Sequence, residues 1–252
     1  MTPDDAETLE DRDAHERQRI AASPYLDLKY STERAPHGTY PDRLARLLVE
    51  RFYHRPGRLL DLGCGRGDHL AAFARLGFDV AGVDISERSR ELAGDFAVEV
   101  VDLDRDRLPF PPESFDFVFS KSVVEHIRNT TTLLANVLEI LRPGGVAVVL
   151  TPSWEHTYKK PFYYEFTHVR PFTAPSLAEA LTLSGFEHAH ASHFYQLPLL
   201  WERPALTPLT ALVRALPLPY RPYDAAPWPA SLNKLIRFSN EVMVLGTGTK
   251  PR

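Results

Sequence analysis

Short runs of branched and aromatic residues alternate along this chain with segments whose apolar residues recur at helical spacing. The runs that predict strands lie at 58–62, 78–84, 97–101, 115–120, 146–151, 186–195 and 241–245. Apolar positions three and four residues apart predict helices at about 41–52, 68–76, 86–93, 130–141 and 175–184. Because strands and helices alternate, the pattern predicts an α/β fold, with a mostly parallel sheet that helices cover on both faces.

The two ends of the chain depart from this alternation. Residues 1–20 carry seven acidic and three basic side chains, and we interpret 1–40 as a partly mobile lead-in to a domain at 41–252. Near the other end, a segment at about 197–238 separates the last two predicted strands and holds eight prolines. This proline-rich insertion is predicted to contain one short helix, at 206–216, and otherwise extended chain.

The insertion has three possible roles. Its aromatic residues could form a lid over a substrate, it could cover the edge of the sheet, or it could make a dimer contact. The aromatic candidates for a lid are Trp201, Tyr220, Tyr223 and Trp228. Peripheral membrane binding is poorly supported, because the apolar helix at 206–216 carries Arg214 as its one basic residue. The sequence does not indicate an oligomeric state.

Composition excludes several classes of function. The chain has 252 residues, of which 44% are hydrophobic, so it can build one large core. A net charge of -4 offers no long-range attraction to phosphodiester backbones, so nucleic acid is not an expected partner. One cysteine, Cys64, cannot form a disulfide within the chain or a thiolate cluster. The acidic N-terminus and the lack of a long apolar run predict a cytoplasmic protein without a transmembrane segment.

The glycine-rich segment 59–69 (LLDLGCGRGDH) follows a predicted strand and opens a predicted helix. Glycines at such a junction let the backbone turn sharply and let a ligand lie against bare peptide N–H groups. Asp84 ends the next strand, 21 residues after Gly63. In a nucleotide-binding βαβ unit an acid at this position accepts hydrogen bonds from ribose hydroxyls, so the pair of features predicts a nucleoside site.

The spacing of the glycines discriminates between nucleotide ligands. A dinucleotide-binding G-x-G-x-x-G loop would place its third glycine at position 68, which is Asp68 here. Asp61, two residues before the first glycine, would repel a pyrophosphate and favours a positively charged ligand. No G-x-x-x-x-G-K-[ST] run is present, which excludes a P-loop. A nicotinamide-dependent oxidoreductase remains an alternative, as does a cofactor-binding subunit without catalysis of its own.

Five segments in order resemble the motifs of class I S-adenosylmethionine-dependent methyltransferases, within the broad small-molecule group often called type 11. They are LLDLGCGRG, VAGVDIS, VVDLD, LPFPPESFDFVFSKSVVEHI and LRPGGVAVV, and they cover roughly residues 58–151. The resemblance implies a Rossmann-like seven-stranded sheet whose last strand is antiparallel. It also implies S-adenosyl-L-methionine as the cofactor and a small molecule as the methyl acceptor.

The resemblance assigns residues of the first two motifs to the cofactor. The glycine loop would hold the methionine part of the cofactor, which implies Asp61, Gly63, Gly65 and Gly67. Asp84 would bind the ribose hydroxyls. These assignments agree with the nucleoside site that the glycine loop itself predicts.

Later motifs complete the implied cofactor site. Ile85 would pack on the adenine, and Asp102, with Leu103 beside it, would accept a hydrogen bond from the adenine amine. Ser120 and Lys121, at the end of the fourth strand, would border the methionine. Lys121 departs from the small or apolar residues that are common at this position in such families.

Transfer of a methyl group to a hydroxyl also requires a group that removes the proton. His126, next to Glu125 after the fourth strand, could be this general base or could simply pack over the cofactor. His168 lies in EFTHVRPFT (165–173), a loop that the resemblance places over the substrate. It could contact the substrate or hold the loop through a structural hydrogen bond.

The substrate side is predicted in less detail. Tyr163, Tyr164 and Arg170 are candidates for lining the substrate pocket. Related chains with a similar His-x-x-x-Phe-Thr run imply an acceptor hydroxyl on a sugar, a glycan precursor or a secondary metabolite. Methylation of cytosine C5 is excluded because the only thiol lies in the cofactor loop, and the missing N-P-P-[YF] run argues against methylation of base amines.

No metal site is predicted. His188, His190 and His193 lie on one predicted strand, where His193 would point away from the other two. No acid or cysteine nearby completes the set of ligands, and surface histidines on a strand are the favoured interpretation.

Overall fold

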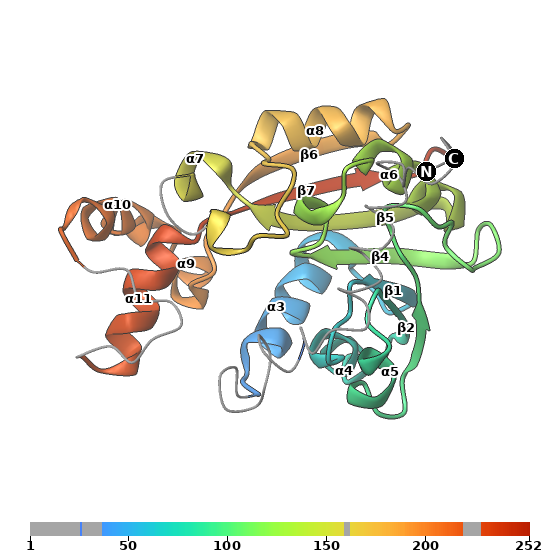
Figure 1. Ribbon diagram of the computed structural model, residues 1–252, viewed down its shortest axis with the longest axis horizontal. Helices are drawn as coiled ribbons and strands as arrows, with labels where there is room; N and C mark the ends of the chain where they lie inside the picture. Colours follow the sequence, from blue (N-terminus) through green and yellow to red (C-terminus); the bar gives the residue numbers. More distant parts are fainter. Residues whose placement is uncertain (1–25, 27–36, 159–161, 219–227) are drawn as a thin grey trace, which may run out of the picture.

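The computed structural model describes residue 26 and residues 37–158, 162–218 and 228–252 (Figure 1). Within these ranges seven strands form one sheet, in the order β3-β2-β1-β4-β5-β7-β6. The strands are β1 (Arg58–Leu62), β2 (Asp79–Asp84), β3 (Ala97–Val100), β4 (Phe115–Lys121), β5 (Leu141–Pro152), β6 (Glu187–Phe194) and β7 (Met243–Thr249). Neighbouring strands from β1 to β5 are parallel, whereas β7 is antiparallel to both β5 and β6. The predicted fold class, including the antiparallel last strand, is confirmed.

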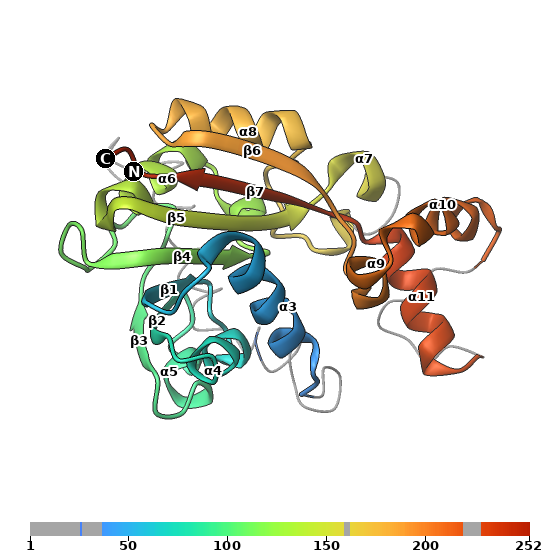
Figure 2. The same cartoon turned by 180° about the vertical axis from the view of Figure 1, so that it is seen from behind.

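Alternate residues of the strands feed two separate hydrophobic cores, one on each face of the sheet (Figures 1 and 2). Leu60 of β1 packs in the core that also holds Leu133 and Leu177, from the helices α6 and α8. Leu59 packs in the core of Phe73 and Leu48, from α4 and α3. The period of two along a strand accounts for this division. The helices are α3 (Tyr40–Leu48), α4 (Asp68–Ala74), α5 (Arg88–Leu92), α6 (Thr130–Ile140) and α8 (Ala174–Leu183).

Strand β5 begins earlier than the sequence predicts. The Pro-Gly-Gly turn at 143–145 was expected to precede the strand, but β5 already starts at Leu141. Leu141 pairs with Phe115 of β4, and the register then shifts across the turn before Val146 pairs with Phe117. The turn is therefore an irregularity within the ladder, which Gly144 permits through its positive φ of 77°.

The insertion is more helical than its sequence predicts. The prediction of mostly extended chain is wrong for the residues that the structure describes. The insertion contains α9 (Pro198–Glu202), η4 (Pro204–Leu206), α10 (Thr207–Ala215) and α11 (Ala230–Asn240). Prolines lie in the first turn of α9, η4 and α10, where a missing N–H costs no helical hydrogen bond. These prolines start helices instead of preventing them. Helices α9, α10 and α11 project as a lobe beyond one end of the sheet (Figures 1 and 2).

Trp201 of α9 attaches this lobe to the rest of the domain. Its ring centre lies 5.8 Å from that of Tyr40 in α3 and 5.5 Å from that of Phe194 in β6. Its indole Nε1 donates a hydrogen bond of 2.7 Å to the carbonyl oxygen of Tyr195. Trp201 is thus a packing residue in this structure. Tyr220 and Tyr223, and most of the lead-in at 1–40, lie outside the described residues.

Candidate active site

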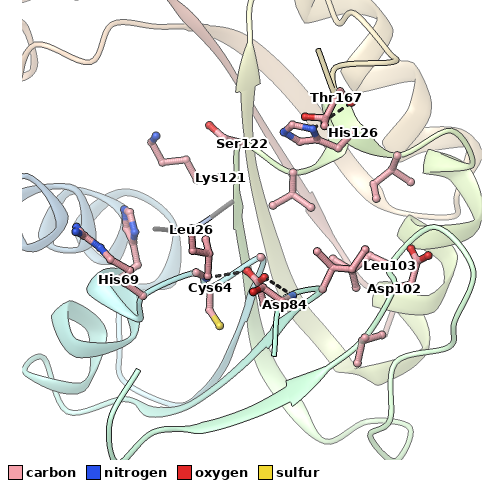
Figure 3. Close-up of a pocket in the computed structure, with 18 of the residues that line it drawn as sticks. Leu26, Cys64, His69, Asp84, Asp102, Leu103, Lys121, Ser122, His126 and Thr167 are labelled. Carbon is pink, nitrogen blue, oxygen red and sulfur yellow. Dashed lines mark hydrogen bonds between the residues drawn. The ribbon is translucent and has the colours of Figure 1, made fainter. Parts of the chain in front are cut away.

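A cavity of about 390 Å³ lies at the carboxyl ends of β1, β2 and β4, where an open α/β sheet keeps its ligand crevice (Figure 3). The glycine loop after β1 forms one wall, and the end of β2 with the segment 101–103 forms another. The turn after β4 and the loop 166–169 close the opposite side. Leu26, from the lead-in, also lines the cavity and is buried.

The glycine loop presents bare backbone to this cavity. Gly63 and Gly65 both line it, and both have positive φ, 71° and 52°. A Cβ on Gly63 would lie 2.3 Å from Cγ2 of Val123, so no larger residue fits there. Of the residues that the structure describes, only Leu26 would lie within 4 Å of a Cβ on Gly65, at 3.9 Å. A side chain at 65 would therefore occupy cavity space that a ligand can use.

Asp84 lies at the centre of the cavity wall. Its carboxylate is buried and accepts hydrogen bonds from the backbone N–H groups of Gly65, at 2.8 Å to Oδ2, and Ser86, at 2.9 Å to Oδ1. Burial raises the pKa of Asp84, and these hydrogen bonds oppose the rise. The backbone thus fixes both oxygens, and their remaining lone pairs can accept hydrogen bonds from a ligand in the cavity.

Ile85, Asp102 and Leu103 line the same cavity. Figure 3 shows Asp102 and Leu103 beyond Asp84. Oδ1 of Asp102 accepts a hydrogen bond of 3.0 Å from the backbone N–H of Asp104, which orients the carboxylate. Ile85 and Leu103 supply apolar contact surface beside it. The pattern of two apolar side chains and one acceptor suits a flat heteroaromatic ring with an exocyclic amine.

Three residues assigned to the cofactor do not line the cavity. Asp61 and Ser120 are buried behind its wall, and Gly67 lies at the N-terminus of α4. Burial, followed by the charge of Asp84, raises the pKa of Asp61 well above its ordinary value. Direct contact of Asp61 with a ligand is not supported by this geometry, because the residue is buried and does not line the cavity.

His69 lines the cavity and was missed by the sequence analysis, although it directly follows the glycine loop. Burial, and next the charge of Lys121, lowers its pKa to about 3, so the ring is neutral at pH 7. Its Nε2 is buried and has no hydrogen-bond partner among the described residues. The cavity wall therefore offers an unsatisfied polar atom, as expected of a site that binds a polar ligand.

Lys121, the last residue of β4, brings a positive charge to the cavity (Figure 3). Burial lowers its pKa, whereas the charges of Glu125 and Glu241 oppose this change. The cavity thus has carboxylates on one side and an ammonium group on the other. A ligand with a positive charge would be attracted by the first and repelled by the second.

Glu125, His126 and His168 come together beside the cavity although 43 residues separate the first from the last. Glu125 is fully buried, and Nε2 of His168 lies 4.0 Å from its Oε1. Its Oε2 accepts a hydrogen bond of 2.8 Å from Oγ1 of Thr151. The rings of His126 and His168 meet edge to face, with their centres 4.7 Å apart. Burial raises the pKa of Glu125 to about 7.

Backbone contacts hold the loop 165–173 against this cluster. The N–H groups of Val169 and Arg170 both donate to the carbonyl oxygen of Glu125, at 2.9 and 3.0 Å. The loop therefore positions His168 next to Glu125 and places Phe166, Thr167 and Val169 on the cavity wall.

His126 lines the cavity directly, while His168 lies behind it. Nδ1 of His126 is 3.2 Å from the carbonyl oxygen of Thr167. A carbonyl can only accept, so Nδ1 carries the hydrogen and Nε2 is the acceptor nitrogen of the neutral ring. This tautomer is the one that a general base requires at Nε2.

Tyr163, Tyr164 and Arg170 do not line the cavity. Their side chains are exposed, and the 3-10 turn η3 (Phe162–Tyr164) buries Phe162 instead. Phe166, 73% exposed, lines the mouth of the cavity. The loop 165–173 therefore borders the cavity through Phe166, Thr167 and Val169, and not through the three residues predicted to line the substrate pocket. Further residues that line the cavity and were not predicted from the sequence include Arg66, Ser86, Ser122 and Arg128.

The expectation that no acid lies near the histidines of β6 is wrong for His193. Its Nε2 lies 2.5 Å from Oε2 of Glu155, which follows β5 and is 38 residues away in sequence. His156 lies beside them, its ring centre 4.6 Å from that of His193. Sequence proximity could not reveal this cluster, because the pairing of β6 with β7 and of β7 with β5 creates it.

Comparisons with known proteins agree with this geometry. In the curated proteins, a Ubiquinone biosynthesis O-methyltransferase of Mesorhizobium japonicum is 35% identical over 100 residues, which cover 37% of this chain and 40% of that protein. A Demethylmenaquinone methyltransferase of Tropheryma whipplei is 30% identical over 128 residues, covering 49% and 52%. The chain thus spans about two fifths to one half of the length of these relatives.

A solved structure shows a similar fold. Phosphoethanolamine N-methyltransferase 2 of Haemonchus contortus, in complex with S-adenosyl-L-methionine, matches with a TM-score of 0.64 at 22% identity. The match covers 94% of this chain and 60% of that one. In the described ranges no helix combines the length and apolar character needed to cross a membrane. A family model described as a methyltransferase domain matches residues 32–191, well over half of the sequence, and the chain therefore belongs to this methyltransferase family.

Proposed function

We propose that this chain binds S-adenosyl-L-methionine in the cavity and transfers its methyl group to a hydroxyl of a small molecule. The observation that carries the proposal is Asp84, a buried carboxylate held by the N–H of Gly65 on the wall that the glycine loop also forms. A nucleoside ribose and an amino-acid tail could then bind to adjacent parts of one wall.

The residues present fit this cofactor. The cavity volume of about 390 Å³ falls within the range of about 300–1,000 Å³ that is usual for sites of small ligands. Asp84 would accept the ribose hydroxyls, while Ile85, Leu103 and Asp102 would hold the adenine. The backbone of Gly63 and Gly65 would border the methionine part. His69, whose Nε2 has no partner among the described residues, would offer a further polar contact.

The proposed chemistry needs alignment and one proton acceptor. When bound, the cofactor supplies a methyl group that its positively charged sulfur already activates for displacement. The acceptor oxygen forms a bond to the methyl carbon as the carbon–sulfur bond breaks, and the hydroxyl proton must go to a base. His126 Nε2 is the acceptor nitrogen on the cavity wall, so His126 is the proposed base.

Glu125 and His168 would act through His126. A proton on His126 gives the ring a positive charge, which an ionised Glu125 stabilises across His168. The two residues are therefore proposed to position His126 and to balance its charge. Burying the carboxyl group of Glu125 costs free energy, and packing over a cofactor alone gives no reason for that cost. The buried acid therefore supports an acceptor that loses a proton during the reaction.

The acceptor itself is proposed as a class. One of the two relatives is named for O-methyl transfer in ubiquinone biosynthesis, which supports a hydroxyl and adds phenols to the candidates. The sugar, glycan-precursor and secondary-metabolite hydroxyls implied by the sequence stay within the proposal. Peripheral membrane contact and a nucleic-acid acceptor are not proposed.

A labelled-methyl assay tests this function. The protein would be incubated with methyl-labelled S-adenosylmethionine and a panel of phenols, catechols, glycosides and amines, followed by metabolite extracts. We expect label in a methyl ether, formed by wild type but not by a variant with His126 replaced. Label in an N-methyl product would contradict the hydroxyl assignment. Binding of the cofactor without transfer to any acceptor would favour the non-catalytic alternative.

The pH dependence of turnover is expected to follow the ionisation of the Glu125 carboxyl group. Its carboxylate form supports the base, and its pKa is raised to about 7, so the active fraction increases as the pH rises through neutrality. We expect kcat/KM to rise between roughly pH 6 and pH 8 and then to level off. Glu125→Gln should lower kcat/KM and shift the inflection from its wild-type position, because the contribution of this carboxylate to the profile is lost. A wild-type profile that falls over this interval would contradict the assignment.

Lys121 is expected to affect the charged cofactor and its neutral product differently. The sulfur of S-adenosylmethionine is positive and that of S-adenosylhomocysteine is not, so an ammonium group in the cavity opposes only the former. Lys121→Met should increase the affinity for S-adenosylmethionine, relative to that for S-adenosylhomocysteine, by roughly threefold to tenfold. Calorimetry measures both affinities. Lys250→Met, at a surface ion pair with Glu113, is the control, and an unchanged ratio in Lys121→Met would contradict the prediction.

A further inference from the structure

A second cluster of ligating side chains lies outside the cavity. Glu155 and His156 belong to the short helix α7 (Trp154–Thr157), directly after β5, and His193 lies near the end of β6. One ligand atom from each residue lies within 4.8 Å of the others. Oε2 of Glu155 and Nε2 of His193 are 2.5 Å apart. None of the three lines the cavity, so the cluster has no part in the proposed methyl transfer.

The protein orients His156 for a ligand role. Ser153 Oγ lies 2.9 Å from Nδ1 of His156, which leaves Nε2 as the nitrogen that can bind a metal. Ser153 is itself fixed, because it is fully buried and its backbone N–H donates to the carbonyl oxygen of Val242 at 2.9 Å. Metal-bound histidines in proteins commonly have their second ring nitrogen held by such a partner.

We propose that Glu155, His156 and His193 form a binding site for a divalent transition-metal ion, with Zn²⁺ as the best match. A site with two imidazoles and one carboxylate binds Zn²⁺ and other first-row transition-metal ions in preference to Mg²⁺ or Ca²⁺, which prefer oxygen ligands. The set supplies three ligands, so a fourth position would hold water or another donor. The side chains of His193 and Glu155 are 37% and 43% exposed, which gives an ion access.

Small side-chain movements suffice to form the site. Glu155 and His193 now share a hydrogen bond, and the metal would replace the hydrogen between them. Ligand atoms around a tetrahedral zinc lie roughly 3.3 Å apart, given metal–ligand distances of about 2.0–2.1 Å. The Glu155–His193 pair must therefore open slightly while His156 approaches. Both partners of this pair are partly exposed, so rotation about their side-chain bonds is not blocked by a packed core.

Glu125, His126 and His168 are also close enough together to hold a metal ion, but they fit one less well. Glu125 is fully buried, and its Oε2 already accepts from Thr151. The Nε2 of His126, which a metal would occupy, is the proposed proton acceptor of the reaction. By contrast, an ion at Glu155, His156 and His193 would join the segment after β5 to β6, the strand that leads into the helical lobe.

Zinc binding by the full chain tests the proposal. The protein would be stripped with chelator, titrated with ZnCl₂ by calorimetry, and then desalted for measurement of bound zinc by mass spectrometry. We expect one equivalent of zinc with wild type. His193→Ala and His156→Ala should each weaken binding by at least about tenfold. Zinc should raise the melting temperature of wild type but not of His193→Ala.

Three controls make the result decisive. His190→Ala, an exposed histidine on the same strand, should bind zinc like wild type. His168→Ala shows which of the two clusters binds zinc. If His168→Ala lost zinc binding while His193→Ala kept it, the proposal would be overturned. S-adenosylmethionine affinity, measured for every variant, verifies that each is folded. Absence of zinc binding by wild type, or equal binding by His193→Ala, would also overturn it.

Discussion

Replacing His126 by alanine is expected to lower kcat by roughly 100-fold to 10,000-fold, the usual contribution of a positioned general base. His126 lines the cavity, and the Thr167 carbonyl fixes the tautomer in which Nε2 is the proton acceptor. The dissociation constant of S-adenosylmethionine should change by less than about threefold, because Asp84 and the glycine loop remain. Labelled-methyl turnover and calorimetry measure the two quantities on the same preparations.

His168→Ala provides the comparison for this variant. His168 lies behind His126 and next to Glu125, so its removal should lower kcat by less than the removal of His126 does. It should also shift the pH profile, since the charge of Glu125 would then reach His126 less directly. Normal turnover in both variants would show that neither histidine takes part in proton transfer, and the proposed base would have to be abandoned.

Replacing Asp84 by asparagine is expected to weaken binding of S-adenosylmethionine by at least about tenfold, because a charged acceptor for hydroxyl donors is lost. The variant also disturbs the hydrogen bonds from Gly65 and Ser86, which would loosen the glycine loop. S-adenosylhomocysteine has the same ribose, so its affinity should also fall, but by a smaller factor, because its neutral sulfur loses no attraction to the carboxylate. Asp84→Asn should therefore shift the ratio of the two affinities against S-adenosylmethionine, in the opposite direction to Lys121→Met.

Asp79→Asn is the matched control for Asp84. Asp79 is the first residue of β2, at the end of the strand opposite Asp84. Its carboxylate is exposed, and its Oδ2 lies 3.5 Å from Nε of Arg58. This variant should bind both ligands like wild type. Equal affinity in Asp84→Asn and Asp79→Asn, with unchanged circular dichroism and melting temperature, would remove the ribose assignment.

The sheet could be predicted because each strand carries its own signal. Leu59 and Leu60 belong to an unbroken apolar run, and the structure places them in different cores, as a strand covered on both faces requires. The start of β5 was less predictable, since Leu141 reads as the end of a helix and joins the sheet only through its pairing with Phe115. Boundaries that depend on a partner strand are not written in local sequence.

The helices of the insertion show a different limit. The stretch 230–240 has Leu232, Leu235 and Ile236 at helical spacing, but the density of prolines before it suggested extended chain. Proline disfavours the interior of a helix and favours its first turn, and the same residue type therefore supports opposite interpretations. Only the position of each proline relative to the apolar spacing, as at Pro198 and Pro208, separates the two.

At the site, motifs identified segments better than they identified side chains. Gly63, Gly65 and Asp84 share one cavity because the ends of adjacent parallel strands lie side by side. Asp61 is in the same motif, yet it lies behind the wall, because it belongs to β1 itself, whereas the cavity begins at the loop beyond the last residue of the strand. His168 reaches Glu125 through two backbone hydrogen bonds of its loop, which no spacing rule in the sequence could provide.

A crystal structure of the chain with S-adenosylhomocysteine would show whether the cavity is the cofactor site. We expect the ligand beside the glycine loop, with both ribose hydroxyls within hydrogen-bond distance of the Asp84 carboxylate and the adenine against Ile85 and Leu103. A ligand bound elsewhere, or one whose ribose has no contact with Asp84, would contradict this expectation.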